Sequence, residues 1–333
     1  MNSVVTSEPA QTSASEPGEK EEKRFFFVRD VRRMIVPGDG CIVTIGAFDG
    51  IHRGHQAILE QVREQQERYD LPTTVIVFEP QPAEYFSQEK SPARLMRLRE
   101  KVNAVLARGI DRVICLRFNS ILRNMEATEF VREVLAKGLK VRSLVVGDDF
   151  QFGAGRGGDF ELLRRLGDEY GFAVTDTRTV LWKGERISST RIRQALERAD
   201  FELVHELLGR PFCIGGRVVY GQQLGRTVGV PTANINLHRY RAPLQGVYTV
   251  RVHRDGESWP GVANVGVRPT VGDIDKPILE VHFLDRSEEV YGQYLNIEFC
   301  SKLRDERKFD GLESLVTAIR QDIVDARAYF GLD

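Results

Sequence analysis

The sequence is poor in cysteine and lacks long apolar runs, and both shortages exclude classes of protein. Its four cysteines, Cys41, Cys115, Cys213 and Cys300, are scattered without a CxxC pair, so we expect neither a zinc finger nor a disulfide framework. Each lies in an apolar, strand-like run, where a free cysteine serves as a small buried side chain. This usage favours a reducing, cytoplasmic location. No apolar stretch approaches the about 18 residues of a membrane helix and the N-terminus lacks a signal-peptide pattern, so we expect no membrane association.

The chain also lacks an excess of charge of either sign. Forty-seven basic residues oppose 48 acidic ones, which gives a formal net charge of -1. Nucleic acids and anionic membranes select basic surfaces, so we expect neither partner and predict small-molecule substrates. The oligomeric state is left open between a monomer and a weak homo-oligomer. At 333 residues, the chain exceeds the about 250 residues at which single cores stop growing, which predicts two domains.

Three regions of the chain differ in their residue pattern. Residues 1–22 are rich in Ser, Glu, Pro and Thr and nearly lack large apolar groups, which predicts a disordered tail. Residues 23–199 alternate strand-like and helix-like segments, which predicts an α/β domain with a doubly wound parallel sheet. In residues 200–333, Gly and Pro separate short alternating runs, and an apolar helical pattern covers 312–330. We expect an antiparallel β-barrel with a terminal helix there, with a sandwich as the alternative.

The carboxyl ends of the expected parallel strands lie at one edge of the sheet. Ligands of such folds bind at this edge, in the segments that follow the strands. These strands cover residues 41–46, 73–78, 112–118, 143–147 and 172–177. Helices are expected near residues 55–69, 94–108, 127–138 and 159–170. We therefore predict a nucleotide site that includes the segment directly after the first of these strands.

That segment, "GAFDGIHRGH", carries two of the six histidines of the chain in a glycine-rich turn between a strand and a helix. Gly46 and Gly50 allow a phosphate to approach the backbone closely. His52 and His55 lie at or near the helix start, where free N–H groups and the helix dipole attract anions. The alternative is an ordinary turn with two surface histidines.

A second anion site is indicated by "RISSTRIRQAL" at residues 186–196. Ser188, Ser189 and Thr190 precede a helix as capping hydroxyls, and Arg193 supplies a guanidinium. Together with the histidine turn, this segment predicts two clamps on a triphosphate, as phosphoryl or nucleotidyl transfer requires. Alone, it fits equally well an ordinary capped helix with solvated arginines.

Two nucleotide-binding motifs can be set aside. "GAGRGG" at residues 153–158 has the glycine spacing of a dinucleotide fingerprint, but five residues separate it from the expected strand, whereas the fingerprint follows its strand directly. No GxxxxGK[ST] pattern occurs in the sequence, so we expect no P-loop phosphotransferase.

Several motifs together resemble one known family. "GAFDGIHRGH", "VFEPQP", "VGDDFQFGAGRGGDF" and "RISSTRIRQAL" are similar to the adenylyltransferase module of the prokaryotic bifunctional riboflavin kinase/FAD synthetase family. "GRVVYGQQLGRTVGVPTANI", "GVYTV", "GVANVGVRPT" and "LEVHFLD" resemble its kinase module. The motifs occur in the family's order from about residue 25 to the C-terminus. Two departures are Ala47, where the family usually has Asn, and Val230, where Phe is common.

The resemblance implies that the first module transfers the adenylyl group of ATP to FMN, which forms FAD and releases pyrophosphate. His52 and His55 would stabilise the pentacoordinate α-phosphorus. Ala47 puts in doubt a side-chain contact to ATP from its position. The full set of implied ATP- and phosphate-binding residues comprises Gly46, Phe48, Asp49, Gly50, His52, His55, Asp149, Ser189, Thr190 and Arg193.

For the second module, the resemblance implies ATP-dependent phosphorylation of riboflavin to FMN. Thr232 and Asn234 of "PTAN" would hold Mg²⁺ and the ATP phosphates, since hydroxyl and amide oxygens suit this hard cation. Glu280 of "LEVHFLD" would accept the proton of the riboflavin 5′-hydroxyl. Without the resemblance, Glu280 also fits a solvent-facing strand residue. The remaining implied ATP- or Mg²⁺-binding residues of this module are Gly216, Gly221, Gly225 and Arg226.

Two other functions compete with this interpretation. A class I aminoacyl-tRNA synthetase also uses an HxGH turn on a parallel sheet, but it needs a "KMSKS"-like loop and normally a basic tRNA-binding region. The sequence offers "RISSTR" and no basic region instead. The barrel could also be a non-catalytic flavin-binding or oligomerisation module, although such a module would not require "PTAN" together with a separate acid.

Overall fold

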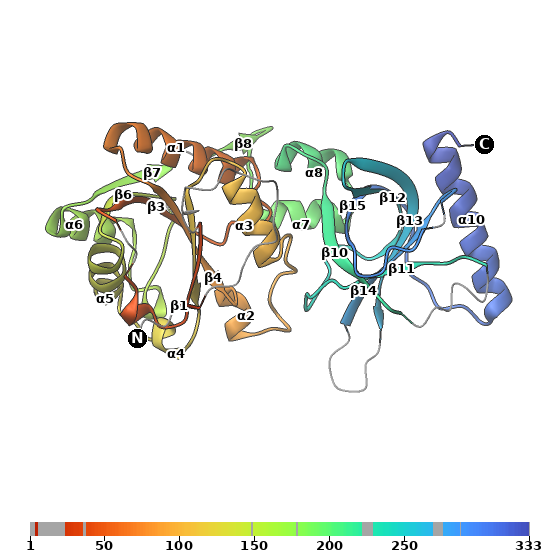
Figure 1. Cartoon of the computed structure of the whole chain (residues 1–333), viewed down its shortest axis with the longest axis horizontal. Helices are drawn as coiled ribbons and strands as arrows, with labels where there is room; N and C mark the ends of the chain where they lie inside the picture. Colours follow the sequence, from red (N-terminus) through yellow and green to blue (C-terminus); the bar gives the residue numbers. More distant parts are fainter. Residues whose placement is uncertain are drawn as a thin grey trace, which may run out of the picture. The chain divides into compact units, whose positions relative to one another are not determined.

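The computed structural model describes residues 4–5, 24–35, 38–147, 149–177, 179–221, 229–268, 276–286 and 288–332. Contacts divide the chain into two compact units, which are described separately below (Figure 1). Unit 1 comprises Met1–Ser91 and Leu98–Ile187, and unit 2 comprises Pro92–Arg97 and Ser188–Asp333. The domain limits predicted above, 23–199 and 200–333, stay predictions.

Unit 1 is built on a sheet with the strand order β1-β2-β5-β4-β3-β6-β7. Six of these strands run parallel, which confirms the predicted doubly wound parallel sheet. They are β2 (Phe25–Val28), β3 (Cys41–Ile45), β4 (Thr73–Glu79), β5 (Arg112–Arg117), β6 (Val141–Gly147) and β7 (Ala173–Thr177). The short β1 (Val4–Val5) pairs antiparallel with β2 at the sheet edge. The rest of the predicted disordered tail, 1–22, lies outside the described residues.

Helices connect these strands close to the predicted positions. Strand β3 is buried along its whole length, as the apolar, β-branched run predicts for a parallel strand covered on both faces. The helices of unit 1 are α1 (Arg53–Tyr69), α2 (Pro82–Phe86), α3 (Leu98–Leu106), α4 (Ser120–Arg123), α5 (Ala127–Phe130), which continues as the π-helix Val131–Gly138, and α6 (Phe160–Tyr170). A small hairpin, β8 (Leu181–Trp182) and β9 (Glu185–Arg186), ends the unit.

The strand order reverses at β3. From β3 the chain proceeds outward through β4 and β5, and then returns to place β6 on the opposite side of β3. Ligands of doubly wound sheets bind at such a reversal, beyond the carboxyl ends of the two central strands. The segments after β3 and after β6 therefore share the edge at which a ligand site is expected.

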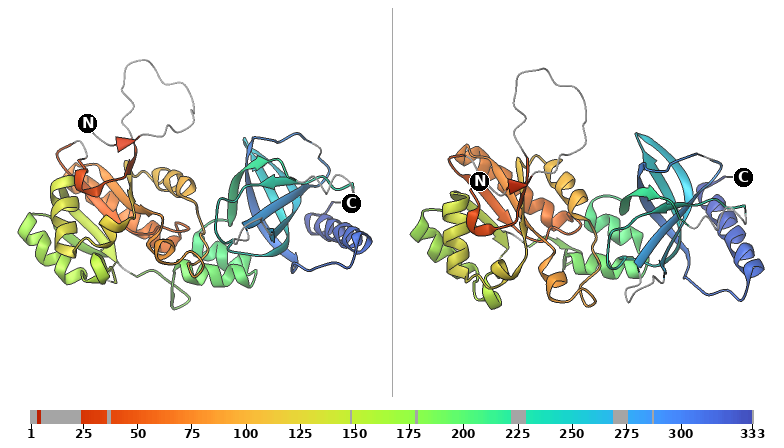
Figure 2. Two further views of the ribbon diagram at one scale, coloured as in Figure 1. Left: turned by 90° about the horizontal axis from the view of Figure 1, so that it is seen from below. Right: turned by 60° about the horizontal axis from the view of Figure 1, so that its bottom comes forward.

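Unit 2 contains a closed antiparallel barrel with the strand order β10-β11-β14-β13-β12-β15 (Figure 2). The barrel is the predicted architecture, and closure excludes the sandwich. Its strands are β10 (Cys213–Val219), β11 (Ala233–Ile235), β12 (Gly246–Arg254), β13 (Glu257–Arg268), β14 (Lys276–Phe283) and β15 (Tyr294–Arg304). Two helices, α7 (Ser189–Glu197) and α8 (Phe201–Leu208), precede the barrel.

The terminal helix α10 (Leu312–Phe330) has the predicted bounds and contacts strands β12, β13 and β15 of the barrel. Its most buried positions, Ala318, Asp322 and Ala326, follow each other at intervals of four residues on one face. The carboxylate of Asp322 accepts two hydrogen bonds of 2.8 Å from the Arg304 guanidinium of β15. This bidentate pair therefore stabilises the contact of the helix with the barrel.

Candidate active sites

The histidine turn after β3 has an unusual backbone. Phe48, Gly50 and Ile51 have positive φ values of 47°, 91° and 44°, a region that side chains with a Cβ adopt at a cost. The side chains of Phe48 and Ile51 are almost completely buried, as is Asp49. The Phe48 ring lies over Gly46, where a Cβ would be 3.1 Å from it. Packing of the turn into the core therefore maintains its strained conformation.

His52 caps the helix that follows this turn. Its Nδ1 accepts a hydrogen bond of 3.2 Å from the backbone N–H of His55, so the hydrogen of the neutral ring is on Nε2. The two imidazole rings stack with centroids 3.6 Å apart. Gly54 permits this, because a Cβ there would lie 3.1 Å from the His52 ring. The structure thus brings the two predicted histidines together at the N-terminus of α1.

His55 is held in its neutral form. Burial, and then electrostatic interactions with His52 and Lys101, keep its pKa well below the ordinary range. Its buried Nδ1 has no hydrogen-bond partner among the described residues, a condition that costs roughly 1–3 kcal/mol for a polar atom. This nitrogen is therefore available to a ligand that enters the turn.

Lys101 on α3 is a residue near this turn that the sequence analysis did not identify. Its side chain is 2% exposed, and its charge contributes to the lowered pKa of His55. Lysine is rarely buried so completely. The only sequence signal is its position beside Val102, within the apolar pattern of a helix. A buried ammonium group adds positive potential to a site expected to bind phosphates.

Asp149 follows β6 at the same sheet edge and is engaged in an ion pair. Its Oδ2 lies 2.8 Å from Nη1 of Arg186 in β9, and this hydrogen bond lowers the pKa of the carboxyl. Nearby, the "GAGRGG" segment forms the short 3₁₀ helix Ala154–Arg156 between the bridged residues Phe152 and Gly158. It does not connect a strand to a helix, so it is not a dinucleotide fingerprint.

The predicted second phosphate segment lies at the start of α7, which belongs to unit 2. The Ser188 side chain caps this helix by accepting a hydrogen bond of 3.2 Å from the N–H of Arg191. Ser189 and Thr190 occupy the first turn. The guanidinium of Arg193 donates a hydrogen bond of 2.6 Å to the carbonyl of Ala93, within the same unit. Ser188 is the capping residue, whereas Ser189 and Thr190 do not precede the helix as predicted but lie within it. The joint role with the histidine turn stays a prediction.

The predicted residues Asn234 and Glu280 lie on the adjacent barrel strands β11 and β14, and β13 flanks β14 on its other side. Asn234 of β11 and Asn264 of β13 are both paired with Glu280 of β14, so the three side chains share one face, with directly opposite Cβ atoms about 5 Å apart. The neighbouring residues Leu279 and Val281 are fully buried, so this face is the one away from the apolar interior. The sequence analysis did not identify Asn264.

The predicted glycines of this module have different roles. A Cβ on Gly221 would overlap the side-chain amide of Asn234, so only glycine allows this close approach. A Cβ on Gly216 would instead overlap the Ile235 side chain, which indicates a packing requirement in the barrel. Gly225 and Arg226 lie outside the described residues. Thr232 directly precedes β11 and is half-buried.

Comparison with known proteins finds family models that cover both groups of residues. A family model described as FAD synthetase matches residues 37–191, and one described as riboflavin kinase matches residues 208–330. A bifunctional riboflavin kinase/FMN adenylyltransferase from Pseudomonas fluorescens is 51% identical over 302 residues, which cover 91% of this chain and 97% of the relative. The relative of the same description from Escherichia coli K12 is 49% identical over 297 residues, which cover 89% of this chain and 95% of the relative. The chain belongs to the bifunctional riboflavin kinase/FMN adenylyltransferase family.

A solved structure supports the same fold. A protein from Streptococcus pneumoniae described as a macrolide-efflux protein matches with a TM-score of 0.75 and 28% identity, over 91% of this chain and 98% of its own. Within the described ranges, no helix of this bifunctional family member is long and apolar enough to cross a membrane.

Membership of the riboflavin kinase/FMN adenylyltransferase family confirms the prediction made from the motifs. The FAD synthetase model covers the histidine turn, Asp149 and Ser189, and the riboflavin kinase model covers Asn234 and Glu280. Among the described residues, no group of three or more His, Cys, Asp or Glu side chains could hold a metal ion. The hydroxyl of Thr232 and the amide oxygen of Asn234 remain suitable ligands for Mg²⁺, which retains several waters.

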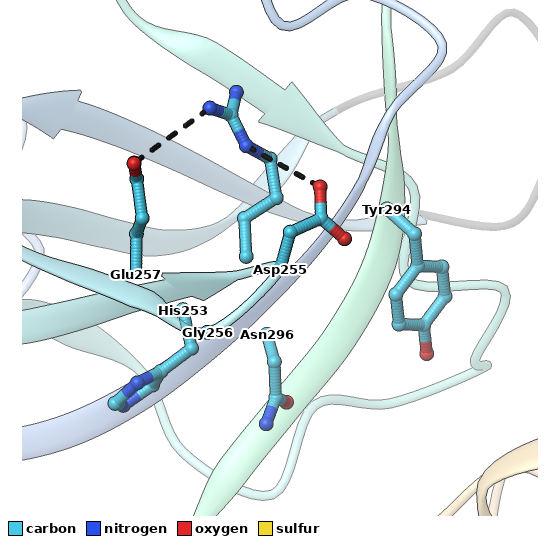
Figure 3. Close-up of a pocket in the computed structure, with 7 residues that line it drawn as sticks. His253, Asp255, Gly256, Glu257, Tyr294 and Asn296 are labelled. Carbon is cyan, nitrogen blue, oxygen red and sulfur yellow. Dashed lines mark ion pairs between the residues drawn. The ribbon is translucent and has the colours of Figure 1, made fainter.

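One cleft of this family member lies apart from both groups. It measures about 410 Å³ and is lined by residues of the β12–β13 hairpin and of β15: His253, Arg254, Asp255, Gly256, Glu257, Tyr294 and Asn296 (Figure 3). Arg254 is paired with Asp255 at 3.8 Å and with Glu257 at 4.0 Å. The cleft contains none of the predicted site residues.

Proposed function

We propose that this chain phosphorylates riboflavin to FMN on the β11–β14–β13 face and adenylylates FMN to FAD at the histidine turn. The observation that carries the proposal is that each family model covers one of two separate groups of polar residues. Each group contains the chemistry that one of the two reactions needs. Two sites on one chain would convert riboflavin to FAD in two steps.

In the kinase step, Glu280 accepts the proton of the riboflavin 5′-hydroxyl. The oxygen attacks the γ-phosphorus of ATP, a new P–O bond forms, and the bond to the β-phosphate breaks to release ADP. Thr232 and Asn234 hold Mg²⁺ and the phosphates, and the ion neutralises phosphate charge when bound. The Asn264 side chain, opposite Glu280, orients the base.

In the adenylyl step, a phosphate oxygen of FMN attacks the α-phosphorus of ATP, and the bond to pyrophosphate breaks. His52 donates its Nε2–H to the phosphate oxygens that gain charge, and neutral His55 supplies a second ring nitrogen. The N-terminus of α1 adds its dipole and free N–H groups. Donors placed where charge develops supply much of the rate enhancement of such reactions.

We also propose the finer assignments that the sequence predicts. Gly46 and Gly50 give ATP access to the turn, and Ser189, Thr190 and Arg193 form the second phosphate clamp. Small molecules are the partners of a cytoplasmic enzyme that acts as a monomer or weak homo-oligomer. Support comes from the balanced net charge of -1 and from the family, whose members are described by these two activities.

The test is to incubate the full chain with riboflavin, ATP and Mg²⁺ and to separate the flavins by chromatography over time. FMN is expected first, followed by FAD, and EDTA should abolish both. Omission of Mg²⁺ with full activity would contradict the metal assignment. Conversion of added FMN to FAD without any conversion of riboflavin would contradict the kinase assignment.

A further inference from the structure

The side chain of His282 contacts the segment that leads into Thr232. Its Nδ1 lies 2.9 Å from the carbonyl oxygen of Pro231. A carbonyl oxygen can only accept a hydrogen bond, so Nδ1 must carry the hydrogen. The carbonyl belongs to the peptide bond between Pro231 and Thr232, so this hydrogen bond fixes the peptide plane that precedes the Thr232 side chain.

The strand register shows why a side chain is needed at this point. The pairing of β11 with β14 ends at Ala233, which lies opposite Val281. His282 is the next residue of β14, and Pro231 lies two residues before Ala233, the last paired residue of β11. The imidazole therefore replaces the missing backbone partner and extends the attachment of β11 beyond its ladder.

The same strand face also carries the proposed base. Glu280 and His282 are two residues apart on β14, so their side chains point to the same side of the sheet. Glu280 is paired with Asn234, and His282 contacts the residue before Thr232. One strand thus fixes the base and both proposed phosphate ligands relative to each other.

We propose that His282 is a positioning residue of the kinase site, which donates Nδ1–H to Pro231 and thereby orients Thr232 toward Mg-ATP. This inference rests on the proposed kinase function. His282 takes no proton in the reaction. Because neutral imidazole of this tautomer and imidazolium both donate from Nδ1, the contact persists when the ring is protonated.

Three substitutions of His282 in the full chain test this role, because they keep, displace or remove the hydrogen-bond donor to Pro231. In His282→Asn, the amide nitrogen takes the place of Nδ1, whereas His282→Gln moves the donor one methylene further out, and His282→Ala removes it. We expect the KM for Mg-ATP to rise about tenfold in His282→Ala, the size of one lost hydrogen bond. His282→Asn should stay within about twofold of the wild type, and His282→Gln should resemble His282→Ala. The pH profile of kcat should keep its shape in all three.

His253→Ala is the matched control, because His253 is also a strand histidine with a side-chain hydrogen bond, of 2.8 Å to Glu298. It should leave the kinase constants unchanged. FMN adenylylation and the melting temperature report whether each variant is folded. An unchanged KM for Mg-ATP in His282→Ala would overturn the positioning role. So would a His282→Asn variant whose KM for Mg-ATP stays as high as that of His282→Ala and whose pH profile of kcat differs from the wild type. A wild-type chain that does not phosphorylate riboflavin would instead overturn the proposed kinase function.

Discussion

The Nδ1 atom of His52 accepts the backbone N–H of His55 at 3.2 Å, and the two rings stack with centroids 3.6 Å apart. One histidine therefore caps the helix on which the other stands. The capping bond uses Nδ1 of His52 as an acceptor, so the hydrogen of the ring is on Nε2. It also places His55 where burial keeps the imidazole neutral.

Loss of either ring should impair FAD formation. We expect His52→Ala and His55→Ala each to reduce FMN adenylylation by about 10²-fold, the effect of one lost transition-state donor. His52→Asn separates two roles, because an asparagine still caps the helix but cannot place a donor where Nε2 lies. The His52→Asn variant should have the melting temperature of the wild type, but its rate of FMN adenylylation should stay as low as that of His52→Ala. Riboflavin phosphorylation is the internal control, and a wild-type rate of FAD synthesis in either alanine variant would remove that ring from the mechanism.

The lowered pKa of His55 predicts a loss of stability in acid. In the unfolded chain the imidazole of His55 titrates near its ordinary pKa of about 6.5. In the folded chain burial lowers the pKa of His55 well below this value, so the ring stays unprotonated at a lower pH. The unfolded state therefore binds more protons below about pH 6.5, and the unfolding free energy falls there with a slope of at most about 1.4 kcal/mol per pH unit. Denaturant titrations of the wild type and His55→Asn should diverge in this range. Parallel curves would show that His55 titrates normally in the fold.

Substitution of Gly221 should impair only the kinase. Its added Cβ in Gly221→Ala would overlap the Asn234 amide and displace a proposed phosphate ligand. We expect a rise of about tenfold in the KM for Mg-ATP, with FMN adenylylation unchanged. Gly311→Ala is the control, since a Cβ there meets nothing within 4 Å. Equal constants for both variants would show that the position of Asn234 does not matter.

The ion pair between Asp322 and Arg304 should stabilise the attachment of α10. The side chain of Asp322 is 8% exposed and that of Arg304 is 22% exposed, so removal of the carboxylate leaves a partly buried charge without its partner. Asp322→Ala should lower the free energy of unfolding of unit 2 by about 1–3 kcal/mol, which is less than for a fully buried pair. Glu133→Ala, which breaks the two surface ion pairs of Glu133 with Arg132 and Lys137 on unit 1, should have no measurable effect in the same denaturant titration. An equally small effect of Asp322→Ala would mean that apolar packing alone holds the helix.

Local patterns were sufficient to predict much of the fold. The bounds of α10 and the position of β3 follow from apolar periodicity, which burial imposes directly on the sequence. The strand β11 was not predicted, because it has only three residues and is formed by pairing with distant β10 and β14. The membership of Pro92–Arg97 in unit 2 was also not predicted. It depends on hydrogen bonds such as that from Arg97 to the carbonyl of Gly215, which leave no periodic signal.

Site residues with a local motif were predicted, and those defined by register were not. His52, Thr232 and Glu280 belong to recognisable motifs, whereas Asn264 becomes relevant only because β13 pairs with β14 opposite Glu280. Lys101 is distinguished by its burial, which a single helical lysine in the sequence does not show. The resemblance implied Gly216 as a binding residue, and this role stays a prediction. The structure adds a packing requirement at this position, because a Cβ there would overlap the Ile235 side chain.

The most direct test of two separate sites is the flavin output of Glu280→Gln. Glutamine keeps the shape of the side chain but cannot accept a proton at neutral pH, so kinase turnover should fall by about 10²–10⁴-fold. Supplied with FMN and ATP, the same protein should make FAD at the wild-type rate, and supplied with riboflavin it should make almost none. Loss of FAD synthesis from FMN in the folded variant, or undiminished phosphorylation of riboflavin, would contradict the account.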